Sequence, residues 1–179
     1  MDIPIPQPFF TPEDPRRFYK AMSNEIVSRI LQASFSVLEL SPGPNANPMN
    51  FLSASAGKRI SSYRVAESSP ANRALLESNR RSRNLLILNT DPKEALEDIY
   101  TYKSSCDLLL LSGLQPEPIP GMLKRAAGKV PFIAIYTDNE RLQPIGNRTE
   151  NLSSALKGYE ITSFSFPERA PSLFFAAQS

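Results

Sequence analysis

The sequence predicts an α/β protein whose parallel sheet carries helices on both faces. The first observation is the run Leu108–Leu111, four consecutive leucines between Asp107 and Ser112. A run this short and this apolar is typical of a strand buried on both faces, as in the middle of a parallel sheet. The second observation is that segments with strand and helix patterns alternate from residue 60 onwards. Such alternation is the pattern of βαβ units.

Each predicted strand is a short apolar or alternating segment bounded by turn residues. We expect strands at residues 60–67, 84–89, 106–112, 130–136 and 159–166. Two of the intervening helices begin where a capping side chain precedes a first-turn proline, at Ser69-Pro70 and Asp91-Pro92. The predicted helices span residues 71–81, 91–103, 121–127 and 151–157, with a last short helix within 167–179.

Residues 1–57 are predicted to form an N-terminal extension to a domain that covers residues 58–179. The extension begins with a proline-rich segment, and an amphipathic helix follows from Pro15 to about Gln32. Alternating polar and apolar residues at 34–40 indicate a short strand. The rest of the extension places three prolines among Gly, Asn, Ser and Ala, which favours a linker or a long irregular loop.

The composition narrows the possible chemistry. The 179 residues include no histidine and a single cysteine, Cys106. Ser-His and Cys-His catalysis are therefore excluded, and a zinc site is disfavoured. The net charge of +2 does not indicate a nucleic-acid partner. The basic cluster of Arg80, Arg81 and Arg83 is expected to lie at a helix end, where its charges offset the helix dipole and face solvent.

We expect a cytoplasmic protein that does not interact with membranes. No segment reaches the roughly 18 apolar residues that a membrane span requires. The first residues also lack the basic and then apolar pattern of a signal peptide.

The segment Tyr63–Glu77, with the sequence YRVAESSPANRALLE, resembles the opening of receiver domains of two-component signalling, particularly those attached to hybrid histidine kinases. The family's later elements are matched in order by residues 91–96, 107–112, 116–121, 130–136 and 155–167. This resemblance implies a flavodoxin-like or CheY-like fold, with a five-stranded parallel sheet, for residues 58–179.

The resemblance places the family's phosphoryl acceptor and metal ligands on residues of different chemistry. The acceptor aspartate falls at Ser112. Of the acidic pair that binds the metal, Glu67 remains and Ser68 takes the second place. A serine hydroxyl is not activated without a nearby base, and a single carboxylate binds Mg²⁺ poorly. The sequence therefore predicts no metal site.

The other two functional positions of the family are also replaced. Its switch hydroxyl falls at Tyr136 or, with a shift of one residue, at Thr137. Its lysine falls at Phe166, or at Ser165 with a shift, so no ammonium group is present to hold a phosphoryl oxygen. The resemblance thus implies a pseudo-receiver that cannot be phosphorylated, has no cofactor and is not an enzyme.

Such a module is expected to act by binding another signalling protein, which is a histidine kinase, a receiver or a downstream regulator, or by forming a homodimer. The N-terminal helix either packs on its own domain or contributes to that interface, and the sequence leaves both open. The candidate interaction residues are apolar and lie near the C-terminus or on this helix: Phe164, Leu173, Phe174, Phe175, Phe18, Met22 and Ile26.

Two other interpretations remain open at this point. One is a flavodoxin-like protein or enzyme that binds a small molecule through Glu67, Ser112 and Thr137, because open parallel sheets bind ligands at the carboxyl ends of their strands. The other is a functional receiver with Asp107 or Glu67 as an atypical acceptor. Asp107 is the weaker choice because it begins its strand rather than ending it.

Overall fold

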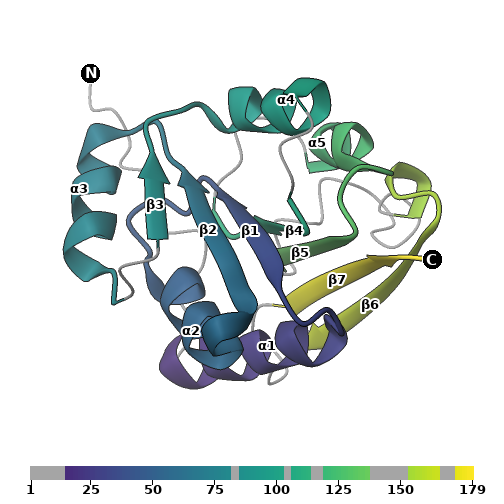
Figure 1. The fold of residues 1–179 in the computed structure, drawn as a ribbon, viewed down its shortest axis with the longest axis horizontal. Helices are drawn as coiled ribbons and strands as arrows, with labels where there is room; N and C mark the ends of the chain where they lie inside the picture. The colour runs from purple at the N-terminus through teal and green to yellow at the C-terminus, as the bar shows by residue number, and fades with distance from the viewer. Residues whose placement is uncertain (1–14, 82–84, 103–105, 114–118, 138–152, 166–171) are drawn as a thin grey trace.

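The computed structural model contains a seven-stranded sheet between two layers of helices (Figure 1). It describes residues 15–81, 85–102, 106–113, 119–137, 153–165 and 172–179. The strands are β1 (Phe35–Leu40), β2 (Ile60–Ala66), β3 (Leu85–Leu88), β4 (Leu108–Leu111), β5 (Phe132–Thr137), β6 (Tyr159–Ser165) and β7 (Ser172–Gln178). The helices are α1 (Pro15–Arg29), α2 (Asn47–Ala56), α3 (Pro70–Asn79), α4 (Pro92–Tyr102) and α5 (Ile119–Ala126).

The strands lie in the order β3-β2-β1-β4-β5-β7-β6. Neighbours from β3 to β5 pair in parallel, whereas β7 is antiparallel to both β5 and β6. The predicted α/β class with a mostly parallel sheet is confirmed. The prediction of a five-stranded receiver-type sheet is wrong.

Two strands that the prediction left out of the sheet account for the error. Without β1 and β7, the observed order becomes β3-β2-β4-β5-β6. This is the flavodoxin-like order 2-1-3-4-5 when the five predicted strands are numbered along the chain. β1 had been assigned to the N-terminal extension, and β7 had been predicted as a helix. Residues 15–57 therefore supply α1, β1 and α2 to the same sheet and helix layers.

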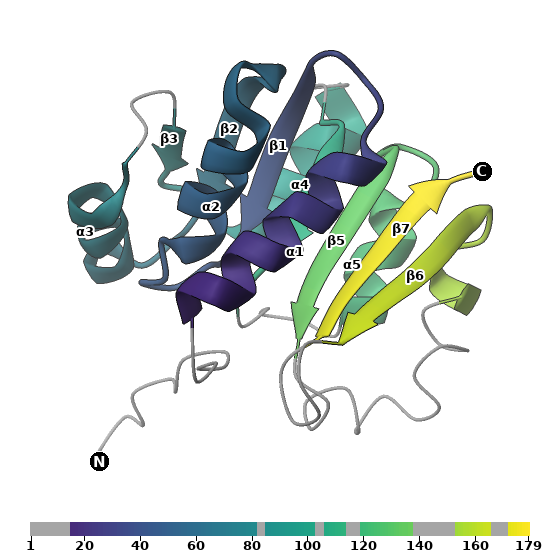
Figure 2. The ribbon, with the colours of Figure 1, turned by 90° about the horizontal axis from the view of Figure 1, so that it is seen from below.

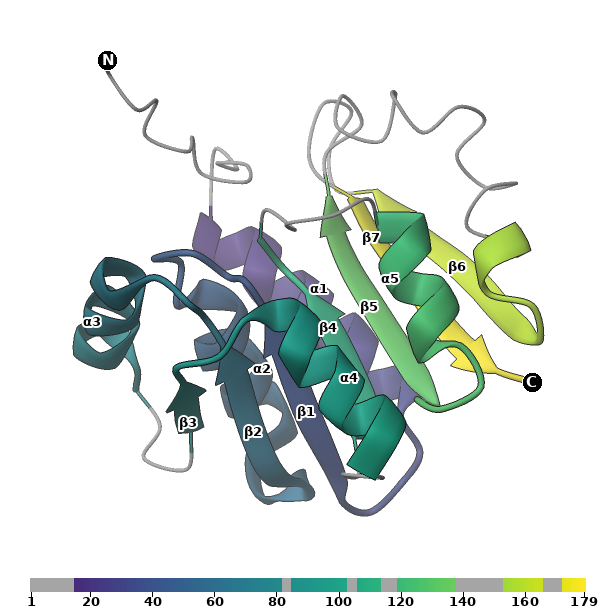
Figure 3. The same cartoon turned by 90° about the horizontal axis from the view of Figure 1, so that it is seen from above.

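β4 is buried on both faces, as the sequence predicts. None of its four leucines is more than 1% exposed. Leu108 and Leu110 pack on the side of α1 and α2, and Leu109 and Leu111 pack on the side of α4 and α5. Figure 2 shows α1 and α2 in front of the sheet, and Figure 3 shows α4 and α5 in front of it. β1, next to β4, is buried along its whole length because helices cover both of its faces.

The predicted linker at residues 41–57 contains α2. Asn45 accepts a hydrogen bond from the N–H of Asn47 (3.0 Å), and Pro48 occupies the first turn. Met49 and Leu52 are buried in the cluster that also contains the apolar side chains of α1. The prolines that favoured an irregular loop instead form a tight turn and the start of a short helix.

Residues 172–178 form a strand rather than the predicted helix. Leu173 and Phe175 pack on the α1 side of the sheet, whereas Ala176 packs on the opposite side. Successive apolar residues are compatible with either a helix or a strand buried on both faces. The pairing of β7 between β5 and β6 decides in favour of the strand.

The apolar residues that we expected at an interaction surface are mostly part of the core. Five of them are at most 3% exposed: Phe18, Met22, Ile26, Leu173 and Phe175. Phe164 and Phe174 are partly buried against the same two core clusters. Within the described residues, the structure contains no helix that is long and apolar enough to cross a membrane.

The central position of β4 predicts a large effect of truncating one of its leucines. Leu110→Ala is expected to lower the free energy of unfolding by about 2–5 kcal/mol, because it leaves a cavity in the core. Leu31→Ala is the matched control, since Leu31 is 90% exposed, and it is expected to change stability by less than about 0.5 kcal/mol. Urea denaturation of both variants tests this, and equal effects would contradict the packing described.

Candidate functional site

The carboxyl ends of β1, β2 and β4 meet at one edge of the sheet. The chain leaves β1 toward β2 on one side, and β4 lies on the other side of β1. In open α/β sheets, ligands bind outside the carboxyl ends of the strands at such a switch point. The residues that follow these three strands therefore form the candidate site: Ser41–Asn45 after β1, Glu67–Ser69 after β2, and Ser112–Gly113 after β4.

The turn after β1 is tight, and its backbone N–H groups are bonded within the protein. Ser41 has a φ of 46°, a left-handed conformation that residues with a side chain rarely adopt. Its N–H donates to the last carbonyl of β2 (2.9 Å). Gly43, with a φ of 65°, donates its N–H to Oε2 of Glu67 (3.1 Å). Pro42 and Pro44 have no N–H to donate.

Glu67 directly follows β2, and two backbone N–H groups hold its carboxylate in place. Oε2 accepts from Gly43 (3.1 Å), and Oε1 accepts from Ser69 (3.0 Å), whose side chain caps α3. Arg73 of α3 donates to the carbonyl oxygens of Glu67 and Ser68 (3.0 and 2.7 Å). A carboxylate offers about four acceptor sites. Each oxygen of Glu67 therefore retains capacity for a further hydrogen bond.

The turns after β1 and β4 touch each other. A Cβ atom added at Gly113 would lie 1.6 Å from the carbonyl oxygen of Ser41, so glycine is required by this close approach. Gly43 differs, because a Cβ atom added there would meet nothing within 4 Å. The turns after β1 and β4 are thus in close contact at Gly113, whereas the Cβ position of Gly43 is uncrowded.

Glu39 of β1 lies beneath this edge and is completely buried. Its Oε2 accepts a hydrogen bond from the hydroxyl group of Tyr63 on β2 (2.8 Å), and its Oε1 accepts a hydrogen bond from Oγ of Ser112. Tyr63 and Ser112 are also buried. The carboxyl group therefore links β2, β1 and the end of β4.

The surroundings of Glu39 favour its protonated form. Burial raises the pKa of Glu39 to about 7, and the hydrogen bonds from Ser112 and Tyr63 only partly offset this. Across the described residues, no lysine or arginine forms an ion pair with it. Its charge therefore changes near neutral pH.

Helix α1 covers the same face of the sheet. Tyr136 of β5 packs against Phe18 and Tyr19 of α1, with ring centroids 6.0 and 5.6 Å apart. The hydroxyl oxygen of Tyr19 accepts a hydrogen bond from Nδ2 of Asn45 (2.8 Å). Asn45 thus fastens the turn after β1 to α1.

Only some of the predicted site residues lie at this edge of the sheet. Glu67 and Ser112 follow β2 and β4, with Glu67 at the site and Ser112 bonded to the buried acid below it. Tyr136 is buried under α1, and Ser68 is exposed. The remaining two predicted positions are Thr137, which ends β5, and Phe166, which lies outside the described residues.

Glu39 is the site residue that the sequence analysis missed. In a strand that alternates polar and apolar residues, an acid normally faces solvent. Two features together identify Glu39. It lies one residue before the end of a strand that a Pro-Gly turn follows, and the partner of that strand is followed by Ser112. That signal has meaning only when β1 is known to pair with β4.

Asp107, the alternative phosphoryl acceptor, has a structural role at the opposite end of β4. Its Oδ2 accepts hydrogen bonds from the N–H and the hydroxyl group of Ser36 (2.7 and 2.8 Å). These bonds join the beginning of β4 to the beginning of β1. Asp107 is therefore remote from the edge at which Glu67 and Ser112 lie.

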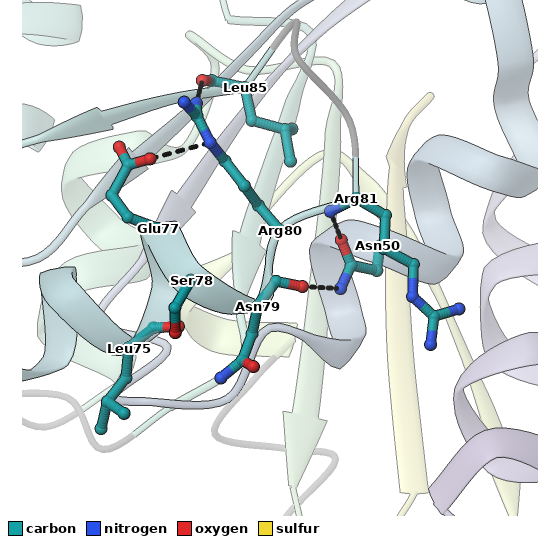
Figure 4. A network of polar contacts seen from close by, with 8 residues as sticks. All are labelled: Asn50, Leu75, Glu77, Ser78, Asn79, Arg80, Arg81 and Leu85. Carbon is teal, nitrogen blue, oxygen red and sulfur yellow. Dashed lines mark hydrogen bonds and ion pairs between the residues drawn. The ribbon is translucent and has the colours of Figure 1, made fainter.

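Two residues of the basic cluster after α3, Arg80 and Arg81, are bonded to neighbouring elements (Figure 4), and Arg83 lies outside the described residues. Arg80 forms an ion pair with Glu77 (2.8 Å) and donates to the carbonyl oxygen of Leu85 (2.7 Å). The side chain of Asn50 accepts from the N–H of Arg81 (2.9 Å) and donates to the last carbonyl of α3 (2.9 Å). These contacts fasten the end of α3 to β3 and α2.

Solved structures share this architecture. Human methyltransferase-like protein 13, in complex with SAH, matches 90% of this chain and 82% of its own length, with a TM-score of 0.67 and 10% identity. Fibrillarin from Aeropyrum pernix, with natively bound S-adenosyl-L-methionine, matches 88% and 74%, with a TM-score of 0.60 and 17% identity. Precorrin-6y C5,15-methyltransferase from Geobacter metallireducens matches 89% and 87%, with a TM-score of 0.62 and 12% identity. The fold is that of these methyltransferases.

The sequence itself matches no protein-family model and no curated protein. The chain also covers only 62% of the SAM-dependent methyltransferase from Agrobacterium tumefaciens, at a TM-score of 0.62. These similarities overturn the receiver interpretation. The predictions of a pseudo-receiver, of a two-component signalling module and of a protein that is not an enzyme are wrong, because they rested on a receiver fold, whereas the structural neighbours are methyltransferases.

The contact between the two turns predicts a difference between two glycine substitutions. Gly113→Ala is expected to lower the free energy of unfolding by about 3 kcal/mol, because the turns after β1 and β4 must separate. Gly43→Ala is expected to cost about 1 kcal/mol, since it meets only the strain of a positive φ. Urea denaturation compares the two variants. If Gly113→Ala is the milder change, the close approach to Ser41 is absent.

The buried carboxyl group predicts a pH dependence of stability. The pKa of Glu39 is raised from 4.5 to about 7 in the folded protein, so its stabilising protonation is fully present below about pH 4.5. Between pH 4.5 and about pH 7, Glu39 loses its proton in the unfolded chain but retains it in the folded protein. The contribution of Glu39 therefore falls by roughly 3 kcal/mol as pH rises through this window and is constant above it.

Glu39→Gln removes this titration and leaves the shape of the side chain nearly unchanged. The test is the difference in unfolding free energy between wild type and Glu39→Gln, measured by urea denaturation from about pH 4.5 to about pH 8. Wild type is expected to lose stability relative to the variant as pH rises toward 7. Parallel curves would show that Glu39 does not hold a proton in the folded state.

Proposed function

We propose that this chain binds S-adenosylmethionine at the carboxyl ends of β1, β2 and β4 and uses it in a methyl-transfer reaction. The observation that carries the proposal is the carboxylate of Glu67, fixed by the N–H groups of Gly43 and Ser69 at this edge. Rossmann-type sheets place an acid about 20 residues after the glycine turn, where it binds ribose hydroxyls. Here the separation from Gly43 is 24 residues.

The residues at this edge fit the nucleoside part of such a cofactor. Ribose hydroxyls are hydrogen-bond donors, and each oxygen of Glu67 retains an acceptor site for one of them. Gly43 has no side chain, and an added Cβ atom there would meet nothing within 4 Å, which favours close approach of a ligand to the backbone. Because two N–H groups already hold the carboxylate, little reorganisation is needed when the sugar binds.

The turn after β1 also distinguishes between classes of nucleoside ligand. Dinucleotides and nucleotides require N–H groups that point at their phosphates. From Ser41 to Pro44, both N–H groups are bonded within the protein and the two prolines have none. This favours a nucleoside without a phosphate, and S-adenosylmethionine belongs to that class. The complexes of human methyltransferase-like protein 13 with SAH and of A. pernix fibrillarin with S-adenosyl-L-methionine support the same choice.

When bound, S-adenosylmethionine supplies a methyl group attached to a positively charged sulfonium. The chain's own contribution is to bind and orient it: Glu67 binds the sugar, and Gly43 leaves room for the ligand. The close contact between Gly113 and Ser41 holds the turns after β1 and β4 together at this edge. This proposal develops the small-molecule interpretation that the sequence left open.

The test is ligand binding by isothermal titration calorimetry. Wild type is expected to bind both S-adenosylmethionine and SAH, the thioether that remains when the methyl group is lost, and NAD is expected not to bind. Glu67→Gln is expected to weaken both interactions by about tenfold to a hundredfold, because an amide places a donor where the backbone and the sugar also donate. Absence of binding by wild type would refute the proposal.

Glu25→Gln is the matched control for this experiment. Glu25 lies on α1 in a solvent-exposed pair with Arg29 (3.8 Å), and exposed pairs of this kind contribute little to stability. This variant is expected to bind both ligands like wild type. Thermal unfolding of Glu67→Gln separates a lost contact from a lost fold.

A further inference from the structure

We propose that Glu39 is a specificity-determining residue of this site, and that its ionised carboxylate favours a ligand bearing a sulfonium over the corresponding neutral thioether. The inference rests on the proposed function, since it concerns the same site. It adds that discrimination between the methyl donor and its demethylated product depends on pH.

Glu39 is separated from the candidate site by one hydrogen bond. Its Oε1 accepts from Ser112, and the next residue, Gly113, touches the turn after β1 at Ser41. The carboxyl group therefore lies directly beneath the junction of the two turns. That junction is the switch point of the sheet, where a ligand of this fold binds.

The charge of Glu39 is not compensated by the elements packed around it. The groups that face it are hydroxyls, which are neutral at physiological pH because burial raises the pKa of each tyrosine. These groups are Tyr63 from β2, Ser112 from β4, Tyr136 from β5 and Tyr19 from α1. Helix α2 carries no charged residue, and the basic residues of α1 lie on its exposed side. The other acid at this edge is Glu67, and a carboxyl group cannot compensate the negative charge of Glu39.

A buried carboxylate without a counter-charge interacts strongly with a cation brought close to it, because little water lies between them. A sulfonium at the strand ends supplies that cation. The coupling is reciprocal: the cation favours ionisation of the carboxyl group, and ionisation strengthens binding of the cation. A thioether carries no charge at the same position and gains nothing. Burial already brings the pKa of Glu39 to about 7, so the change of charge occurs near neutral pH.

The experiment is calorimetric titration of wild type with S-adenosylmethionine and with SAH from about pH 5.5 to about pH 8. The measured quantity is the ratio of the Kd for SAH to the Kd for S-adenosylmethionine. Both ligands carry the same amino and carboxyl groups, so the pH dependence that these groups contribute cancels in the ratio. In wild type this ratio is expected to rise about three- to tenfold with increasing pH. In Glu39→Gln the ratio is expected to stay constant at its low-pH value.

Tyr63→Phe provides a second variant that keeps the carboxyl group. The hydrogen bond from Tyr63 lowers the pKa of Glu39, so its removal is expected to move the midpoint of the rise to higher pH. If Glu39 had only a structural role, Tyr63→Phe would not shift this midpoint. If Glu39→Gln fails to fold, wild type and Tyr63→Phe still decide the question.

The two proposals fail in different ways. If wild type binds neither ligand, the proposed function is refuted, and the role of Glu39 falls with it. If both ligands bind and their ratio is independent of pH in wild type, S-adenosylmethionine binding stands and the role of Glu39 is overturned.

Discussion

The pairing of β1 with β4 is the constraint on which the rest of this structure depends. It places a strand from the first quarter of the chain beside the buried leucine strand and makes β1 the turning point of the sheet. The same pairing brings Glu39 to Ser112 and the turn after β1 to Gly113. The arrangement of the sheet and the candidate site therefore both depend on this pairing. Separating residues 1–57 from residues 58–179 would remove β1 and, with it, both features.

The sequence predicts the elements of this fold better than it predicts their arrangement. β2, β3, β4 and β5 lie close to their predicted positions, because their apolar runs and the caps between them are local signals. β1 and β7 were misplaced for a physical reason, since strand partners are chosen by contacts far apart along the chain. With those two strands removed, the remaining order is the flavodoxin-like one. A plausible but different fold thus satisfied the local pattern of residues 58–179.

The candidate site was predictable only in part. Glu67 was identified from its position at the end of a strand, both as the remnant of a metal site and, in the small-molecule interpretation, as a ligand-binding residue. Glu39 was not predictable, because its burial follows from α1 and α2 covering a face that the sequence leaves undefined. The turn at Ser41 is similar, since prolines that suggest a loose linker form a tight connection whose N–H groups are all bonded.

The distance along the chain between β1 and β4 also affects how the protein folds. The bonds from Asp107 to Ser36 and from Ser112 to Glu39 close loops of 71 and 73 residues. Closing loops of this length costs entropy before any contact compensates for it, and proteins dominated by such contacts fold slowly. Until β4 arrives, the edge of β1 is unpaired and its carboxyl group is hydrated. Ionisation of Glu39 opposes its burial, so the closure of the sheet is expected to become less favourable as pH rises from about 4.5 to about 7.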